Sequence, residues 1–205
     1  MQDIAAACEE LTRAVKDLGM VAAYVGTNFP FDLDDPRMDD FYRTIVALDV
    51  PLFMHPASTG GVGGPDDPRM GRFDMSIIFG YASEETIAAA QLVLGGVLDR
   101  HPKLDVCISH GAGTMPYVWP RFEAMCKFRD WAPDSVREHG FKAVLNRLWF
   151  DAHVEGQGAH ALMVETYDRD RLVFGTNFGG WDTPSEIDDF AASLTPNSKR
   201  LLRMI

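Results

Sequence analysis

Five short apolar segments alternate with segments of helical periodicity along the whole chain. The apolar segments cover residues 20–28, 50–55, 104–109, 147–152 and 171–176, and the helical segments cover 1–18, 34–49, 83–101, 114–130, 133–146, 158–168 and a last region from about 183. Strands that are apolar on both faces must be buried on both, which is typical of a parallel sheet covered by helices. Because right-handed crossovers join such strands, we expect them to be neighbours in chain order, with the helices outside. We expect Ser83 to cap the helix that begins there.

Polar residues stand where these strands end. His55, His110 and Asn177 occupy the ends of three strands, and Asp151 with His153 occupies the end of a fourth. A (β/α)8 barrel collects its active site at this rim. A doubly wound sheet binds ligands at the same edge, but it usually has a glycine-rich nucleotide loop after its first strand, and "VGTNFPFD" is not such a loop. The pattern therefore favours an α/β fold of the (β/α)8 TIM-barrel type.

The number of strands limits what this chain can be. Five strands cannot close an eight-stranded barrel, and an opened sheet would expose unpaired backbone groups at its edges. We therefore expect residues 1–205 to form a single domain that is the C-terminal part of a longer barrel, whose N-terminal strands are missing from this chain.

The charge and cysteine content exclude several kinds of partner. With 30 acidic and 19 basic residues, the net charge of -11 opposes the phosphates of nucleic acids and anionic membrane surfaces. No segment reaches the roughly eighteen apolar residues of a membrane span, and the N-terminus does not resemble a signal peptide. The cysteines, Cys8, Cys107 and Cys126, are too few and too scattered for a disulfide framework. We expect a cytoplasmic protein.

Imidazole and carboxylate groups that converge from separate strands can bind a divalent metal and leave a position for water. His110 has the strongest case, because the glycines of "SHGAG" let a ligand approach closely. His55 could instead be a core histidine bonded to a neighbouring carbonyl, and His153 could lie in a site or in a surface loop. His101, at the end of a helix, is expected to be structural. We interpret the glycine-rich segment from residue 57 to about 80 as an active-site loop.

Five motifs in order resemble a known family. They are "MQDIAAACEELTRAV", "DLDDPRMDDFYRTIVALDVPLFMHP", "ETIAAAQLVLGGVLDRHPKLDVCISHGAGTMPYVWPR", "LWFDAHV" and "DRDRLVFGTN". Together they resemble the metal-dependent, amidohydrolase-related family typified by 2-amino-3-carboxymuconate-6-semialdehyde decarboxylase. The resemblance implies a (β/α)8 barrel, usually with zinc, that decarboxylates or hydrolyses aromatic acids and their ring-cleavage products.

The resemblance also implies roles for single residues. In "FMHP", His55 resembles the family's metal-ligand histidine, and in "SHGAG", His110 resembles the catalytic histidine that polarises the metal-bound water. In "PYVWPR", Arg121 resembles the arginine that holds the substrate carboxylate, reaching into the neighbouring subunit of a homodimer. We add His153 as a candidate substrate-binding residue. A guanidinium group can form two parallel hydrogen bonds with a carboxylate. An imidazole next to a metal-bound water can take a proton from that water.

Two departures from the family pattern leave the function open. The His-X-His pair that supplies two metal ligands is absent from this sequence, and Asn177 stands where the family has a metal-binding aspartate. A neutral amide attracts a cation less strongly than a carboxylate does. Asp182 could compensate, or Asn177 could simply be a turn residue. One hypothesis is a decarboxylase or hydrolase for a small carboxylated acid, and the alternative is a catalytically silent member that binds a ligand or a partner subunit.

Overall fold

The computed structural model describes residues 2–56, 68–178, 180, 183 and 186–204. Its strands form one sheet in the order β1 (Ala23–Gly26), β2 (Leu52–His55), β3 (Val106–Ile108), β4 (Trp149–Asp151) and β5 (Leu172–Val173). All neighbouring strands are parallel. The predicted parallel sheet and its strand order are confirmed, with shorter strands than predicted. Residues 57–67 of the predicted active-site loop, and Asp182, lie outside the described residues.

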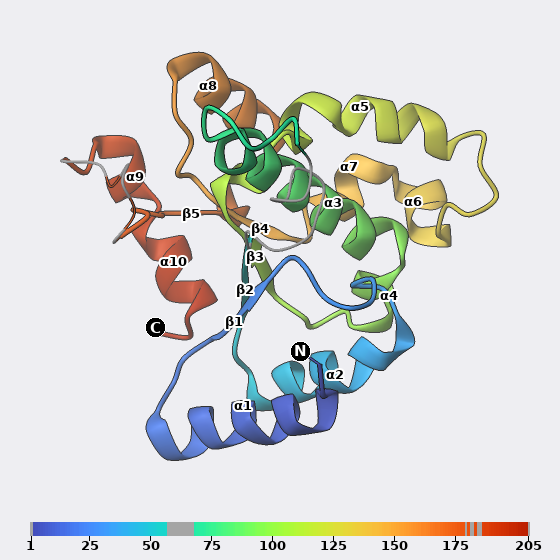
Figure 1. Cartoon of the computed structure of the whole chain (residues 1–205), viewed down its shortest axis with the longest axis vertical. Coiled ribbons are helices and arrows are strands. Elements are labelled where there is room, and N and C mark those ends of the chain that lie inside the picture. Colours follow the sequence, from blue (N-terminus) through green and yellow to red (C-terminus); the bar gives the residue numbers. More distant parts are fainter. Residues whose placement is uncertain (1, 57–67, 179, 181–182, 184–185, 205) are drawn as a thin grey trace.

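Helices connect the strands and surround them (Figure 1). They are α1 (Ile4–Leu18), α2 (Asp39–Leu48), α3 (Tyr81–Leu94), α4 (Val97–Arg100), α5 (Met115–Cys126), α6 (Asp134–His139), α7 (Phe141–Leu145), α8 (Gln157–Thr166), α9 (Asp189–Ser193) and α10 (Thr195–Leu201). The predicted helix over 83–101 is divided into α3 and α4, because Gly96 has a φ of 68°, a left-handed conformation that interrupts a helix.

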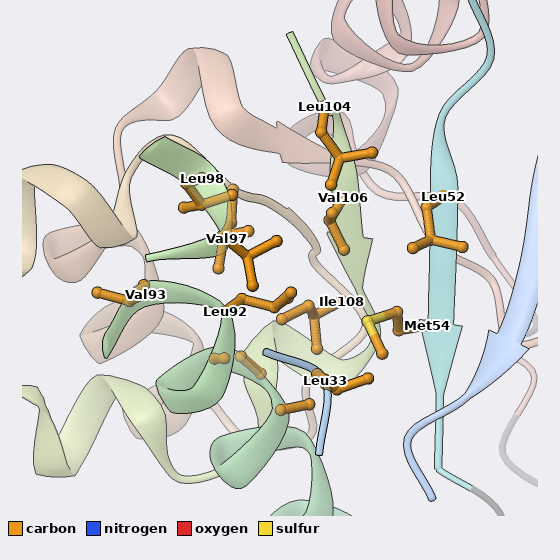
Figure 2. Close-up of a cluster of buried hydrophobic side chains, with 14 of the residues drawn as sticks. Leu33, Leu52, Met54, Leu92, Val93, Val97, Leu98, Leu104, Val106 and Ile108 are labelled. Carbon is orange, nitrogen blue, oxygen red and sulfur yellow. The ribbon is translucent and has the colours of Figure 1, made fainter. Parts of the chain in front are cut away.

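One face of the sheet packs against helices and forms the main core. On this face, Leu52 and Met54 of β2 and Val106 and Ile108 of β3 are each at most 1% exposed. Figure 2 shows apolar side chains of α3 and α4 next to these strands: Leu92, Val93, Val97 and Leu98. Full burial of one such side chain contributes about 2 kcal/mol, so this layer fixes α3 firmly against the strands.

The opposite face of the sheet carries the alternate side chains of the same strands. A second apolar cluster forms there, made of Phe53, Cys107, Trp149, Val173 and Leu201. Since Leu201 belongs to α10, the expectation that all helices lie on the outer face is wrong for α10. An apolar sheet face must be buried against some other element, and α10 provides that cover. Tyr24, on the same face of β1, is 70% exposed, so the cover does not reach this end of the sheet.

The start of α3 differs from the prediction. A π-helical turn, Ser76–Gly80, continues directly into Tyr81, so Ser83 lies inside the helix and its Oγ donates to the Phe79 carbonyl oxygen at 2.9 Å. The prediction that Ser83 caps this helix is wrong. By length and composition the segment Ser76–Leu94 could cross a membrane, contrary to our expectation, but half of it is buried inside the protein. Core helices of soluble proteins have the same properties, so this is weak support for a membrane span.

Candidate active site

Three histidines come together at the edge of the sheet where the strands end. His55 is the last residue of β2, whereas His110 and His153 each follow their strand, β3 or β4, by two residues. The ring centroids of His55 and His110 are 5.1 Å apart, and those of His110 and His153 are 5.9 Å apart. The parallel sheet thus brings these side chains together as the strand ends predict. Their chemical roles remain predictions.

The ring of His55 has one nitrogen fixed by the backbone. Nδ1 donates to the carbonyl oxygen of Pro56 at 2.8 Å, and the rings of Tyr24 and Tyr81 flank the imidazole at centroid distances of 6.3 and 5.8 Å. A hydrogen on Nδ1 leaves the lone pair of a neutral ring on Nε2, the nitrogen that can bind a metal. A core histidine would make the same bond to a neighbouring carbonyl. The partly buried ring lies beside that of His110, and the role of His55 as a metal ligand remains a prediction.

The ring of His110 is held by a buried carboxyl group from α3. Its Nδ1 lies 2.6 Å from Oε1 of Glu85, and the same oxygen accepts a 2.6 Å hydrogen bond from Oγ of Ser109. The side chain of Glu85 is 1% exposed, compared with 26% for that of His110. Our sequence reasoning missed Glu85, because an acidic residue near the start of a helix is usually explained by the helix dipole. The available signal was the acidic pair of "SEETIAAAQ", which precedes a wholly apolar helix face.

The loop that follows β3 has an unusual backbone. His110 and Ala112 have φ values of 47° and 58°, and Gly111 and Gly113 between and after them have φ values of 59° and 63°. For residues with a Cβ, the left-handed region costs on the order of 1–2 kcal/mol, so two such residues in one turn represent stored strain. Strain of this kind clusters at functional sites, which supports a functional interpretation of this loop.

Contacts on two sides hold this strained loop in place. On one side, Oγ1 of Thr86 accepts from the Thr114 amide at 2.9 Å and lies 3.2 Å from the Ala112 carbonyl oxygen. On the other side, the hydroxyl of Tyr167 donates to the Gly111 carbonyl oxygen at 2.8 Å. Gly113 allows α3 to approach, since a Cβ there would lie 2.0 Å from the carbonyl oxygen of Ala82. This close approach brings Glu85, one turn further along α3, to the ring of His110.

Asp151 supports the same loop from β4. Its Oδ1 accepts from the main-chain amides of His110 at 2.8 Å and His153 at 3.2 Å. At Gly175, after β5, a Cβ would lie 3.0 Å from the carboxyl carbon of Asp151, so a larger residue there would press against the Asp151 side chain. Removal from water raises the pKa of Asp151 to about 6; the charge of His110 lowers it and that of Glu85 raises it. Asp151 therefore positions two histidines through their backbone.

Asn177 lies in a turn after β5. Its φ is 45°, and its carbonyl oxygen accepts from the Gly180 amide at 2.7 Å and from Oγ1 of Thr183 at 2.8 Å. The side-chain amide lies against Gly180, where a Cβ would be 2.3 Å from Nδ2. These contacts are those of a turn residue, the simpler of the two interpretations. The role of Asn177 as a metal ligand remains a prediction.

Arg121 is exposed on α5, a helix that packs against α7 and α8. An exposed guanidinium on an outer helix is accessible to a second subunit, as the resemblance implies. Its binding to a substrate carboxylate, and the same role for His153, remain predictions.

The residues described here fit part of a metal site. Among them, no group of three or more His, Cys, Asp or Glu side chains is arranged to hold a metal ion. His55 offers one oriented imidazole nitrogen. A catalytic metal usually has three protein ligands, so the described part of the chain does not fit a complete catalytic metal centre.

A family profile described as amidohydrolase matches residues 1–202. The chain belongs to the amidohydrolase family. The predicted resemblance is thereby confirmed, and it extends over almost the whole chain.

Curated relatives of this chain act on carboxylated compounds, according to their names. It is 26% identical over 179 residues to 2-amino-3-carboxymuconate-6-semialdehyde decarboxylase of Dictyostelium discoideum, covering 87% of this chain and 48% of the relative. It is 29% identical over 185 residues to 2-keto-4-carboxy-3-hexenedioate hydratase of Sphingobium, and the match covers 87% of this chain and 49% of the relative. It is 30% identical over 229 residues to gamma-resorcylate decarboxylase of Rhizobium radiobacter, covering 100% and 68%. The chain thus spans about half the length of the first two relatives.

Solved structures share the fold of this chain. A 2,6-dihydroxybenzoate decarboxylase complexed with 2,6-dihydroxybenzoate has a TM-score of 0.79 at 24% identity, and the match covers 98% of this chain and 68% of that one. A dihydroxybenzoic acid decarboxylase from Polaromonas with bound manganese and 2-nitroresorcinol also has a TM-score of 0.79, at 22% identity, covering 100% and 67%. At these identities the likeness shows the fold: the parallel sheet corresponds to part of the TIM-barrel decarboxylases.

Proposed function

We propose that this amidohydrolase contributes to the active site of a metal-dependent carboxy-lyase that acts on a small carboxylated aromatic or ring-cleavage acid. The observation that carries this proposal is the cluster of His55, His110 and His153 at the ends of the strands, with His110 bonded to the buried Glu85. The relatives support the substrate class, because decarboxylases and a hydratase among them are all named for carboxylated compounds or their products.

His110 is the proposed proton-transferring residue. When an aromatic acid loses CO2, the electrons of the broken carbon–carbon bond remain on the ring carbon, and that carbon must take up one proton. A protonated imidazole can give the hydrogen of Nε2 to the carbon while its Nδ1 hydrogen stays with Glu85. Water then returns a proton to Nε2 of the His110 imidazole. Addition of water to a double bond also requires protonation of a carbon, so the same residue can serve the hydratase type of reaction.

The other roles follow the family resemblance. His55 is a proposed ligand of a divalent cation, with Asn177 as a second ligand, and His153 and Arg121 are proposed to bind the substrate carboxylate. The cation itself would attract the anionic substrate. We predict zinc, whereas manganese is bound in the similar Polaromonas decarboxylase. We also propose a cytoplasmic homodimer in which Arg121 reaches the neighbouring site.

A second candidate function follows from the incomplete ligand set. The described residues contain no group of three metal-ligating side chains, and Asn177 is neutral. A protein of this kind could bind the carboxylated acid without converting it. This alternative predicts binding without release of CO2.

The test is an assay of the longest protein that contains this chain, with manganese or zinc and 2,6-dihydroxybenzoate as the probe. A His110→Asn variant should lower kcat by about 10²- to 10⁴-fold without loss of metal, since general acid–base catalysis contributes that much. Asparagine tolerates the positive φ of this position, so the loop should fold. A His55→Ala variant should lose metal content.

His160→Asn is a matched control, because His160 lies on α8 and packs against Phe190 at a centroid distance of 4.5 Å. It should leave kcat unchanged. Undiminished turnover in His110→Asn would refute the proposed role of His110. If the unmodified protein binds the acid but releases no CO2 from any carboxylated aromatic or ring-cleavage acid tried, the silent alternative is correct.

A further inference from the structure

We infer that Glu85 is a positioning residue for His110: its buried carboxylate fixes both the orientation of the ring and the nitrogen that carries the hydrogen. The inference rests on the proposed function for its catalytic meaning, but its physical content can be measured without substrate or metal. It assigns a task to a residue on α3 that lies outside the strand ends from which the site was predicted.

The contact itself is short and directional. Nδ1 of His110 and Oε1 of Glu85 are 2.6 Å apart. An ionised carboxylate only accepts hydrogen bonds, so with Glu85 ionised the hydrogen is on Nδ1 and the lone pair of the neutral ring is on Nε2. Oγ of Ser109 donates to the same carboxylate oxygen and fixes its place. Hydrogen bonds of this charge-assisted type are about twice as strong as neutral ones.

The burial of Glu85 indicates that its carboxylate has a role other than stabilising the fold. The residue is 0% exposed, and within the described part of the chain its second oxygen, Oε2, has no hydrogen-bond partner. A buried carboxylate with one unpaired oxygen is a net cost to folding, on the order of 1–3 kcal/mol for the unpaired group. An apolar residue would fill the same place on α3 at lower cost, so the contacts with the ring of His110 and the hydroxyl of Ser109 account for a carboxylate here.

The surroundings show that this task is specific to Glu85. Asp151, a second carboxylate near His110 among the described residues, accepts from the main-chain amide of His110. Thr86, the next residue on α3, fixes the loop through Ala112 and Thr114. The backbone of His110 is thus held by β4 and its loop by Thr86, while the ring is held by Glu85.

Nuclear magnetic resonance of ¹⁵N-histidine-labelled protein tests this inference directly. In the unmodified protein, the neutral ring of His110 should be the Nδ1–H tautomer, with a strongly downfield Nδ1 proton. In Glu85→Gln, which keeps the shape of the side chain, the amide oxygen still accepts the bond, but the proton should move upfield because a neutral acceptor bonds more weakly. In Glu85→Leu, the ring should shift toward the Nε2–H tautomer.

Glu84→Gln is the matched control, since it removes one carboxylate from the neighbouring position of the same helix. It should leave the His110 signals in place. An unchanged Nδ1 proton and tautomer in Glu85→Gln would overturn the inference, and this outcome can be read even if Glu85→Leu does not fold.

A second readout separates this inference from the proposed function. If the whole protein turns over a carboxylated acid, Glu85→Gln should lower kcat by about ten- to hundredfold, the usual effect of removing a supporting residue, with little change in KM. Turnover with an unchanged kcat in Glu85→Gln would overturn the positioning role and leave the proposed function standing. Absence of turnover in the unmodified protein, with the predicted shifts present, would instead remove the proposed function and leave the contact established.

Discussion

The two ends of the sheet satisfy their charges in different ways. At the end where the strands begin, Asp105 accepts 2.8 Å bonds from Nε1 of Trp149 and Nη2 of Arg203, and Arg203 also donates to Asp49 at 2.9 Å. At the end where the strands finish, Oε2 of Glu85 has no partner among the described residues, His110 has a strained backbone and Asp151 has a raised pKa. The first end thus has its charges paired, whereas the second carries the histidine cluster, and barrels in general carry their active sites at the end where the strands finish.

The largest effect should come from Gly113→Ala. The added Cβ would lie 2.0 Å from the carbonyl oxygen of Ala82, and alanine at a φ of 63° adds backbone strain. Steric displacement and strain together should lower the free energy of unfolding by about 3 kcal/mol or more. Urea denaturation measures it. Gly158→Ala on α8, where a Cβ meets nothing within 4 Å, is the control and should not destabilise. Equal stability in both variants would contradict the close approach of α3 to the His110 loop.

Asp151→Asn should change how stability depends on pH. Because the folded state raises the pKa of Asp151 from 3.8 to about 6, folding favours the neutral form. This group therefore adds stability at pH below 3.8, and the contribution is lost as pH rises through 6. The shift corresponds to about 3 kcal/mol, which water at the partly exposed rim should reduce to about 2 kcal/mol.

The neutral asparagine should remove this pH dependence in the metal-free protein. Near pH 7, Asp151→Asn should be as stable as the unmodified protein or more stable, since an amide oxygen can still accept from His110 and His153. Denaturation series between pH 4 and 7 measure the difference. If the two proteins lose stability in parallel across that range, Asp151 does not have the raised pKa.

Asp105→Asn should have a smaller effect, and only at the other end of the sheet. The amide oxygen can replace one acceptor, but the ion pair with Arg203 is lost. For a pair this exposed, with side chains 23% and 33% exposed, we expect a loss of about 1 kcal/mol at low salt and less at high salt. Thermal denaturation measures the loss, and the His110 resonances should not move. A shift of those resonances would show that the two ends are coupled.

Asn177→Asp should have the smallest effect on folding. Both residues tolerate a φ of 45°, so the free energy of unfolding should change by less than about 0.5 kcal/mol. In the longest protein containing this chain, the added charge should raise metal content if Asn177 occupies the ligand position. Metal analysis after dialysis measures this, and Gln157→Glu, which adds the same charge at an exposed position on α8, serves as the control. Equal metal content in the Asn177→Asp variant and the unmodified protein would support the turn interpretation.

The helices and strands and their order along the sheet can be predicted from the sequence. Continuous apolar segments such as "VCI" of β3 can only be strands buried on both faces, and the helices between them force a parallel sheet in chain order. From that order it followed that His55 and His110 meet, because parallel strands end at one edge. Ser83 was misjudged as a cap, since the helical backbone continues upstream into a π-helical turn that local cap residues do not reveal.

The groups that contact these histidines depend on tertiary packing. Glu85 and His110 are separated by 25 residues, and they meet because Gly113 lets α3 approach the loop after β3. The packing of α10 on the opposite face of the sheet likewise depends on contacts of Leu201 with Cys107, Trp149 and Val173. No local sequence pattern predicts these contacts. Periodicity reports which side of an element is buried, whereas the partner of a buried side chain depends on how close two backbones can come.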